Sequence, residues 1–517
     1  MLLRALLLLL VTGVACWPVW GMPDLDGTEG RRVQIALEML RSGDWLVPSL
    51  GGQPTWAKPP LHYWIQAGCL HWFGDSLLWA RLPSVLGAAA MAWVAGEVLR
   101  RHFGSGTGWV GALGIACGPL VVATWPTIEI DPLFASFTAI SLACLASGAA
   151  EGRCWLVVAS GLCGGLALLQ KGPPYFLFAA GAYVVWWQHS RLRAFAWHLL
   201  PMLGVALCYY APLWLWRVKP GEMLAVANEE SVGRLLFLDW EHIKPIPEYW
   251  LRALAVMLPF GLWARSDWRD AGGSAPTSGG VAAVAGDGRD TLLRMCRWSA
   301  LLAFAALTVF PGRPTRYLLP GVPLLVVAFA PAVARFAKAA QPLPPFARRS
   351  LFVVGGIASL ALVVLPFVPR AGIAAIGCAA AAAVGAGLVR CGRDVVAFCL
   401  LMPVVGAWTV GLERSQAWLD SSRARLPAGG LLRRELAVLG VDTAALRTMG
   451  HFDSPLLLAA GLLPPGDEFA RGAWRGRWIL NEVGDPSLRV PAEYRSRLRL
   501  DLPFKSFELR ERVGEGR

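Results

Sequence analysis

Several ionisable side chains stand at the ends of long apolar segments, where they are placed to do chemistry at a membrane surface. Asp26 and Glu29 follow the first apolar segment, and Asp131 lies in the short turn EIDP between two later ones. An acid at this place faces anionic headgroups, so a purely structural role is unfavourable. An ionisable residue beside a membrane span is a functional hypothesis by default. We therefore expect functional roles for these three carboxylates.

Two lysines lie in rigid, proline-containing surroundings. Lys58 belongs to TWAKPPLHYW, where two prolines fix the backbone and the aromatic residues suit a membrane interface. A lysine held there can bind a lipid phosphate as a compact point charge. The alternative is that Lys58 has no binding role and only extends its ammonium group from the membrane interface into water. Lys171, in LLQKGPPYF, fits either a functional role or a simple helix break. Both interpretations stay open for each lysine.

The elements that must position these residues follow from composition. The chain has 517 residues, of which 56% are hydrophobic and 16% charged, and its net charge is +13. Soluble domains contain about 25% charged residues, so this chain lacks the charge to cover several soluble domains. Extensive disorder and collagen-like or disulfide-scaffold folds are excluded as well. The composition predicts a polytopic α-helical membrane protein.

Membrane-spanning helices need about 20 mostly apolar residues each. The first segment has a signal-like appearance with Arg4 before an apolar run, and we expect it to stay as an uncleaved first span. The sequence predicts about thirteen spans, at residues 3–20, 78–99, 107–126, 132–149, 154–170, 173–188, 196–217, 249–264, 294–310, 317–336, 351–369, 371–389 and 395–412.

Charge is distributed unevenly between the two sides of these spans. With the N-terminus in the cytoplasm, every inner loop is rich in Arg or Lys, among them Arg100–Arg101, Arg153 and the Gly/Ala/Ser-rich loop 266–290, which we expect to be flexible. This positive-inside pattern explains much of the net charge without any nucleic-acid partner. The outer side then holds the loop 21–77 and the tail 413–517. We expect a transmembrane domain at 1–412 and a periplasmic domain at 413–517.

The outer segments have recognisable local patterns. Thr28 is a plausible N-cap and Gly43 a helix stop, and an apolar stripe of Val33, Ala36, Leu37 and Leu40 lies between them. This predicts an amphipathic helix at the membrane surface. The polar tail contains the short runs RWILNEV and AEYRSRLRLDLPF, which favour a small α/β domain of about 100 residues. The cysteines indicate neither a disulfide framework nor a zinc site.

Taken together, three motifs resemble one family. DGTEGRRVQIALEMLRSGDW, QPTWAKPPLHYW and the ARLPS at 80–84 are similar to segments of bacterial GT-C glycosyltransferases of the protein O-mannosyltransferase and 4-amino-4-deoxy-L-arabinose lipid A transferase type. The resemblance covers most of residues 20–325. It implies the GT-C fold and transfer of a sugar from a polyprenyl phosphate to an acceptor on the outer membrane face.

The family's first outer loop supplies the catalytic carboxylate. One subgroup has adjacent Asp-Glu, where this chain has Thr28 and Glu29. Another reads Asp-x-Thr/Ser-Glu-Ala-Arg, which matches Asp26, Thr28, Glu29 and Arg31, with Gly30 for the alanine. The resemblance thus implies that Asp26 or Glu29 takes the acceptor proton while the phosphate leaves, and that Arg31 binds substrate.

Further site residues are implied by later motifs. Asp131 resembles the family's second-loop aspartate, and Lys171-Gly172 its Lys-Gly turn. Substrate-binding roles follow for Lys58, Lys171, Arg234, His242, Arg313, Arg316 and Tyr317. Arginines on the outer side suit bidentate contacts to a phosphate and, with a lysine, neutralise its developing charge.

A metal is doubtful in this chain. In the aminoarabinose enzyme, a histidine pairs with a glutamate beside the Lys-Pro motif to hold one. Here Ala57 stands at that glutamate position, and His242 alone would make a poor site. A divalent metal therefore stays an open alternative, with His242 as its weak candidate ligand, and we otherwise expect His242 to be a substrate-binding or structural residue.

Other functions remain as alternatives. No Walker A or dinucleotide-binding pattern is present, which fits a lipid-linked donor. A transporter or lipid-sugar flippase would place ionisable groups near the bilayer midplane, often in inverted repeats, whereas here they cluster in loops. A non-catalytic homologue is the third option, because Thr28 and Ala57 replace family acids. The sequence leaves the sugar open and the acceptor as a lipid, a wall polymer or a protein.

Overall fold

The computed structural model describes residues 2–20, 28–50, 53–55, 58–74, 76–187, 192–217, 281–309, 315–338, 430–441, 446–449, 478–482, 494–501 and 506–512. These residues fall into two compact units. The first draws on Met1–Gly21, Ala57–Leu61 and Arg81–Leu412, and the second on Met22–Trp56, His62–Ala80 and Glu413–Arg517. Each is described here by itself.

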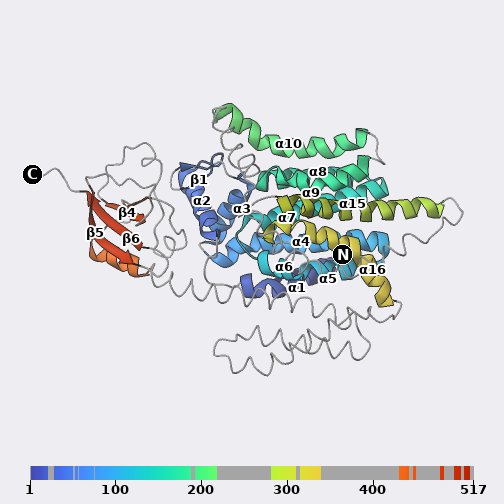
Figure 1. Ribbon diagram of the computed structural model, residues 1–517, viewed down its shortest axis with the longest axis horizontal. Coiled ribbons are helices and arrows are strands. Elements are labelled where there is room, and N and C mark those ends of the chain that lie inside the picture. Colours follow the sequence, from blue (N-terminus) through green and yellow to red (C-terminus); the bar gives the residue numbers. More distant parts are fainter. Residues whose placement is uncertain are drawn as a thin grey trace, which may run out of the picture. The chain divides into compact units, whose positions relative to one another are not determined.

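The first unit is a bundle of helices that run side by side (Figure 1). It contains α1 (Leu2–Trp20), α4 (Leu77–Phe103, from Arg81 onward), α5 (Ser105–Ala116), α6 (Pro119–Thr124), α7 (Ile130–Glu151), α8 (Cys154–Lys171), α9 (Pro174–Trp187), α10 (Leu192–Trp216), α15 (Val281–Val309), the 3₁₀ turn η2 (Thr315–Leu318) and α16 (Gly321–Lys338). Among the described residues, four helices are long and apolar enough to cross a membrane: α4, α7, α8 and α10.

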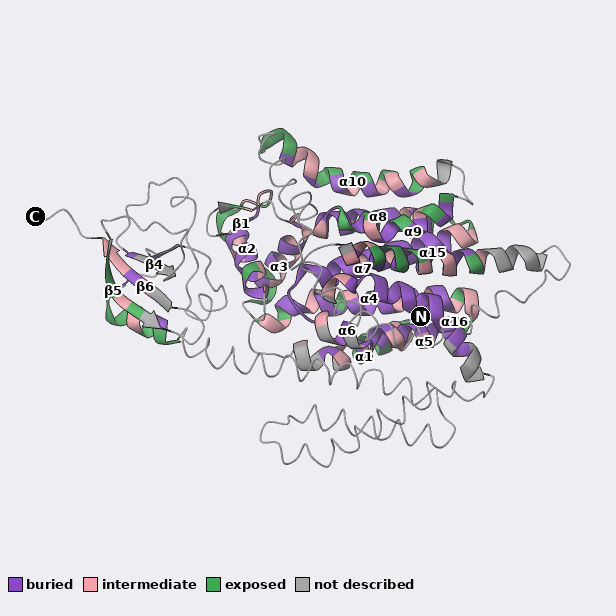
Figure 2. Cartoon of the chain, in the orientation of Figure 1, coloured by how far each residue is buried: buried purple, intermediate pink, exposed green. Residues whose placement is uncertain are grey.

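Small residues let these helices pack closely. A Cβ on Gly161 of α8 would lie 2.2 Å from the His198 carbonyl oxygen of α10, and one on Gly165 would lie 2.6 Å from Val205. Glycine at these positions therefore allows the two backbones to approach, as is common between membrane helices. Figure 2 shows that α7 is almost entirely buried, whereas α10 keeps exposed stretches. The exposed positions of α10 include Trp197, Leu200 and Leu207, which suits a lipid-facing surface.

Two predicted segments differ from the structure. The span expected at 107–126 is two helices, because the chain turns at Gly118, which is extended (φ −63°, ψ 137°). A proline disfavours helical backbone angles at the residue before it, so α5 cannot continue through Gly118 and a new helix, α6, begins at Pro119. The loop expected at 266–290 is helical from Val281 onward, as the first part of α15. The predicted spans at 249–264, 351–369, 371–389 and 395–412 lie outside the described residues.

The second unit contains α2 (Glu29–Ser42), the two-residue strands β1 (Ser49–Leu50) and β2 (Gln53–Pro54), and α3 (Leu61–Phe73, from His62 onward). The helix predicted from Thr28 to Gly43 is present, and Gly43 adopts the left-handed conformation (φ 69°) that ends it. Val33 and Ala36 of the predicted stripe are buried. Leu37 and Leu40 are only partly buried, because Ile35 and Met39 take the core positions and pack on Tyr63 of α3.

The tail contributes a helix at 430–438 and a four-stranded sheet to the second unit. The strands are β3 (Leu446–Met449), β4 (Trp478–Glu482), β5 (Tyr494–Asp501) and β6 (Ser506–Arg512), in the order β3-β4-β6-β5. β3 is parallel to β4, and the other pairs are antiparallel. β4 and β5 fall on the two apolar runs singled out in the sequence.

Candidate functional site

Three charged side chains of the first unit meet at one end of the helix bundle, and we call Asp131, Lys171 and Arg316 the charge cluster. Asp131 contacts the Lys171 ammonium group through Oδ1. Its other oxygen, Oδ2, lies 3.1 Å from Nε of Arg316. One carboxylate thus serves two cations that come from segments about 40 and 185 residues away in the chain.

Local structure explains the position of Asp131. It lies in the first turn of α7, where the positive end of the helix dipole favours an acid. Pro132 follows it, and a proline is tolerated in a first helical turn because its missing N–H has no helical partner there. Gln170 donates from Nε2 to the Ile130 carbonyl oxygen over 3.2 Å and so links the end of α8 to the start of α7.

Lys171 is placed by a helix end. It is the last residue of α8, where the helix dipole favours a cation. Gly172 then takes φ 86° and ψ −145°, a conformation open essentially only to glycine, and α9 begins two residues later at Pro174. A Cβ on Gly172 would lie 3.9 Å from Pro59 Cγ, so the Lys58-Pro59 segment runs beside this turn.

Arg316 and Tyr317 are held by the 3₁₀ turn η2. The turn is anchored by Leu318 and Leu319, which are fully buried. The Lys171 Nζ atom lies 4.0 Å from the centroid of the Tyr317 ring and 5.4 Å from that of Phe134. An ammonium group over aromatic faces is stabilised electrostatically, more strongly where water is excluded. The lysine is thus enclosed by one acid and two rings.

Exposure separates the three members of the charge cluster. The side chains of Asp131 and Lys171 are 9% and 12% exposed, whereas that of Arg316 is 39% exposed. Two cations share one carboxylate, so the cluster itself carries one uncompensated positive charge. A guanidinium that keeps an accessible edge beside a desolvated lysine is suited to bind an anion such as a phosphate.

The other predicted residues divide into three groups. Lys58 lies in the first unit, next to the Lys171-Gly172 turn. Glu29 and Arg31 lie on α2 in the second unit, where Glu29 is buried and Arg31 exposed. The remaining four are outside the described residues, so their predicted roles stay predictions: Asp26, Arg234, His242 and Arg313.

Some notable residues escaped the sequence analysis. Arg32, next to Arg31, is half-buried and donates from Nη1 to the Tyr63 hydroxyl over 3.1 Å. Arg81, the arginine of the ARLPS string, is 1% exposed. Gln170 gave no signal apart from its place before the Lys-Gly turn. Two adjacent arginines look alike in sequence, and only the helix rotation set by packing decides which one turns inward.

The metal site that the family resemblance suggests is not tested by the structure, because His242 lies outside the described residues. Ala57 has no ligand atom, and no group of three His, Cys, Asp or Glu side chains comes together in the described part of the chain. We derive no step through a metal.

Comparisons with known proteins find similar sequences. The sequence model of the dolichyl-phosphate-mannose-protein mannosyltransferase family matches residues 57–216. The undecaprenyl phosphate-α-4-amino-4-deoxy-L-arabinose arabinosyl transferase of Shewanella sediminis is 26% identical over 62% of this chain and 58% of its own length. The Edwardsiella ictaluri protein of the same name is 25% identical over 66% of this chain and 61% of its own. The chain thus spans about three fifths of these relatives.

The fold has a solved counterpart. The crystal structure of ArnT from Cupriavidus metallidurans bound to undecaprenyl phosphate matches with a TM-score of 0.68 and 17% identity, and the match covers 99% of this chain and 98% of ArnT. This likeness shows a helical membrane protein with the GT-C fold. The family model, the related sequences and the shared fold agree with one another, and each is a similarity of this chain to GT-C proteins of the ArnT type.

Proposed function

We propose that the protein is a glycosyltransferase that moves a sugar from a polyprenyl-phosphate donor to an acceptor at the outer face of the bacterial inner membrane. The observation that carries this proposal is the charge cluster, in which one buried carboxylate holds a lysine and an arginine at one end of an apolar bundle. The names of the related transferases, and the undecaprenyl phosphate bound to the structural neighbour, support the same donor class.

The cations of the cluster act on the leaving group. When the acceptor's nucleophilic atom attacks the anomeric carbon, the bond from that carbon to the phosphate oxygen breaks and negative charge grows on the phosphate. Lys171 and Arg316 neutralise this charge, with Lys58 from the neighbouring segment. Preorganised charges of this kind are usually the largest catalytic contribution. Asp131 holds both cations in place before the donor arrives and helps to position the acceptor.

A carboxylate of the first outer loop takes the proton. Asp26 or Glu29 accepts it from the acceptor hydroxyl or amine as the new bond forms, and direct displacement inverts the configuration at the sugar carbon. Arg31, Arg234, His242, Arg313 and Tyr317 contribute to substrate binding in this proposal. The acceptor in this proposal is lipid A, another glycolipid or a protein.

The membrane arrangement is part of the proposal. About thirteen spans, a cytoplasmic N-terminus and a periplasmic tail put the charge cluster on the outer side, and the division lies between 1–412 and 413–517. The positive-inside distribution of arginines supports this orientation.

The decisive experiment is a transfer assay with purified full-length protein, a polyprenyl-phosphate sugar and lipid A. Asp26→Asn and Glu29→Gln are compared with Asp44→Asn, which changes an acid of the same loop that lies outside the Asp26-x-Thr28-Glu29-x-Arg31 pattern. We expect one of the first two variants to lose activity by 100-fold or more, on the order expected for removal of a general base, and Asp44→Asn to keep it. Full activity in both variants contradicts the assigned base, and sugar flux into sealed proteoliposomes without covalent product contradicts the transferase.

A further inference from the structure

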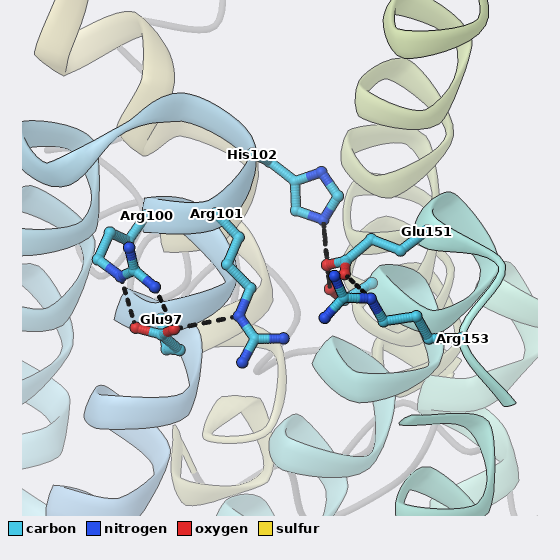
Figure 3. A network of polar contacts seen from close by, with 7 residues as sticks. Glu97, Arg100, Arg101, His102, Glu151 and Arg153 are labelled. Carbon is cyan, nitrogen blue, oxygen red and sulfur yellow. Dashed lines mark hydrogen bonds and ion pairs between the residues drawn. The ribbon is translucent and has the colours of Figure 1, made fainter. Parts of the chain in front are cut away.

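A second set of charged residues lies at the opposite end of α7, far from the charge cluster, and we call it the arginine rim. It comprises Glu97, Arg100, Arg101, His102, Glu151, Arg153 and Arg289 (Figure 3 shows all but the last). In the sequence these arginines belong to loops that merely orient the protein. The structure brings them together from the end of α4, the turn between α7 and α8, and the first third of α15.

Two carboxylates organise the rim. Glu97 accepts hydrogen bonds from Nε and Nη2 of Arg100, at 2.7 and 2.6 Å, and from Nε of Arg101 at 3.1 Å. Glu151 lies 2.8 Å from Nε of Arg153 and 3.2 Å from Nε2 of His102. Ser147 donates to Glu151 over 2.7 Å.

A fourth arginine reaches the same place from α15. A Cβ on Gly288 would lie 2.9 Å from the Ala150 carbonyl oxygen, so α15 passes directly against the end of α7. The next residue, Arg289, is exposed and lies over the Phe103 ring, 5.8 Å from its centroid. The neighbouring Asp290 does not neutralise it, because Asp290 pairs with Arg294 at 2.9 Å.

The rim carries more positive than negative charge. Among the described residues, four arginines of the rim face two carboxylates. Arg100 places two nitrogens on Glu97, whereas Arg101 and Arg153 are each tied to a carboxylate through Nε. This leaves the terminal nitrogens of Arg101 and Arg153, and the exposed Arg289, for an anion. Tethered guanidinium groups are preorganised, so less entropy is lost when they bind a phosphate.

The surroundings indicate a lipid as the source of that phosphate. The Arg101 guanidinium lies 6.0 Å from the ring centroid of Trp155, which is 57% exposed. Seven residues further along α8, on the same face, Leu162 is 46% exposed. An interfacial tryptophan with an apolar helix face behind it suits a headgroup at the rim and an acyl chain along α8. A soluble phosphate would gain nothing from that face.

We propose that the arginine rim binds the phosphate of an anionic phospholipid, with Arg101, Arg153 and Arg289 as its ligands. In this proposal the lipid joins the adjacent ends of α4, α7 and α8 to the part of α15 that carries Arg289. This site is independent of the proposed glycosyl transfer, since it lies at the other end of the bundle and touches none of the residues assigned to that reaction.

The test measures thermal unfolding of the full chain in phosphatidylcholine nanodiscs, with and without phosphatidylglycerol. We expect phosphatidylglycerol to raise the Tm of the wild type and the double variant Arg101→Gln/Arg153→Gln to lose this rise. Arg41→Gln, which removes an exposed arginine of α2, should keep it. In a lipid titration each arginine removed should weaken binding on the order of fivefold, since a basic residue near a charged bilayer contributes about 1 kcal/mol.

Three outcomes overturn the proposal. These are an equal Tm of the wild type in both lipids, a rise retained by the double variant, and a rise reproduced by inorganic phosphate in phosphatidylcholine alone, which would mean a soluble ligand. If the double variant does not fold, the wild type is measured at increasing salt concentration instead. The increase in its Tm caused by phosphatidylglycerol must then shrink as ionic strength rises. An increase in Tm that persists at high salt refutes the arginine contacts.

Discussion

The charged residues at the two ends of α7 differ in how they relate to the helix dipoles. At its start, Asp131 and the partner Lys171 both agree with the dipoles of their helices, the acid at an N-terminus and the base at a C-terminus. The other end of α7 is about 33 Å away. There Glu151 is the last residue of α7 and Arg153 precedes α8, so each charge is unfavourable with respect to its helix dipole. The two residues form an ion pair instead, with Nε of Arg153 2.8 Å from the Glu151 carboxylate.

The difference shows which end can do chemistry. In the charge cluster Asp131 and Lys171 are largely buried, the carboxylate is shared between two cations and the lysine borders aromatic rings, so the charges of this pair act in a medium that screens them little. The arginine rim is more exposed, with Arg153 at 52%, and water and salt weaken its ion pairs. Substitutions at the first end should therefore change catalysis and stability strongly, and those at the second should change stability weakly.

The largest effect is expected at Lys171. Lys171→Met keeps much of the side chain's volume but removes the ammonium group that neutralises the leaving phosphate. Loss of one such preorganised charge lowers turnover by about 100-fold to 1,000-fold. The assay measures sugar transfer at saturating donor. The control is Lys338→Met, which changes the last residue of α16. Turnover within threefold of the wild type would remove Lys171 from the reaction.

Asp131→Asn tests whether the shared carboxylate holds the cluster together. It leaves Lys171 and Arg316 without their counter-ion in a buried place, and breaking such a pair costs about 3 kcal/mol. We expect a clear drop in Tm, together with a raised KM for the donor because the cations are no longer fixed. Asp290→Asn, at an exposed aspartate, should lower Tm far less. Equal decreases in Tm would show that burial of Asp131 does not add to the stability that its ion pairs contribute.

Gly172→Ala tests the turn that places Lys171. A Cβ at φ 86° and ψ −145° strains the backbone by about 1 to 3 kcal/mol, and Gly204→Ala in α10, where a Cβ meets nothing within 4 Å, should not destabilise. Thermal unfolding of the two variants gives the comparison. A Gly172 variant as stable as the Gly204 variant would mean that the turn can take another conformation.

The smallest effect is expected at Glu151. Glu151→Gln weakens the contacts to Arg153 and His102 at a partly exposed site, where such pairs contribute about 0 to 1 kcal/mol. Tm should fall slightly at low salt and be unchanged at high salt, with transfer activity retained. A loss as large as that of Asp131→Asn would erase the contrast between the two ends of α7.

Much of this could be predicted residue by residue. Apolar length predicted α7, α8 and α9 to within a few residues. Asp131 and Lys171 were singled out by their type and place, and Arg316 by the family resemblance. The helix between Thr28 and Gly43 followed from its end signals. The break at Gly118 was missed because hydropathy is continuous there, although the Gly-Pro pair was visible.

By itself, the sequence determined the properties that depend on neighbours along the chain: a helical membrane protein, the positions of helix ends, and which loops carry acids and bases. It could not decide that Asp131 meets both Lys171 and Arg316, that Arg32 rather than Arg31 turns inward, or that orienting arginines form a rim. Those contacts join distant segments, and they depend on helix rotation and on glycine-mediated close packing, which only the folded chain sets.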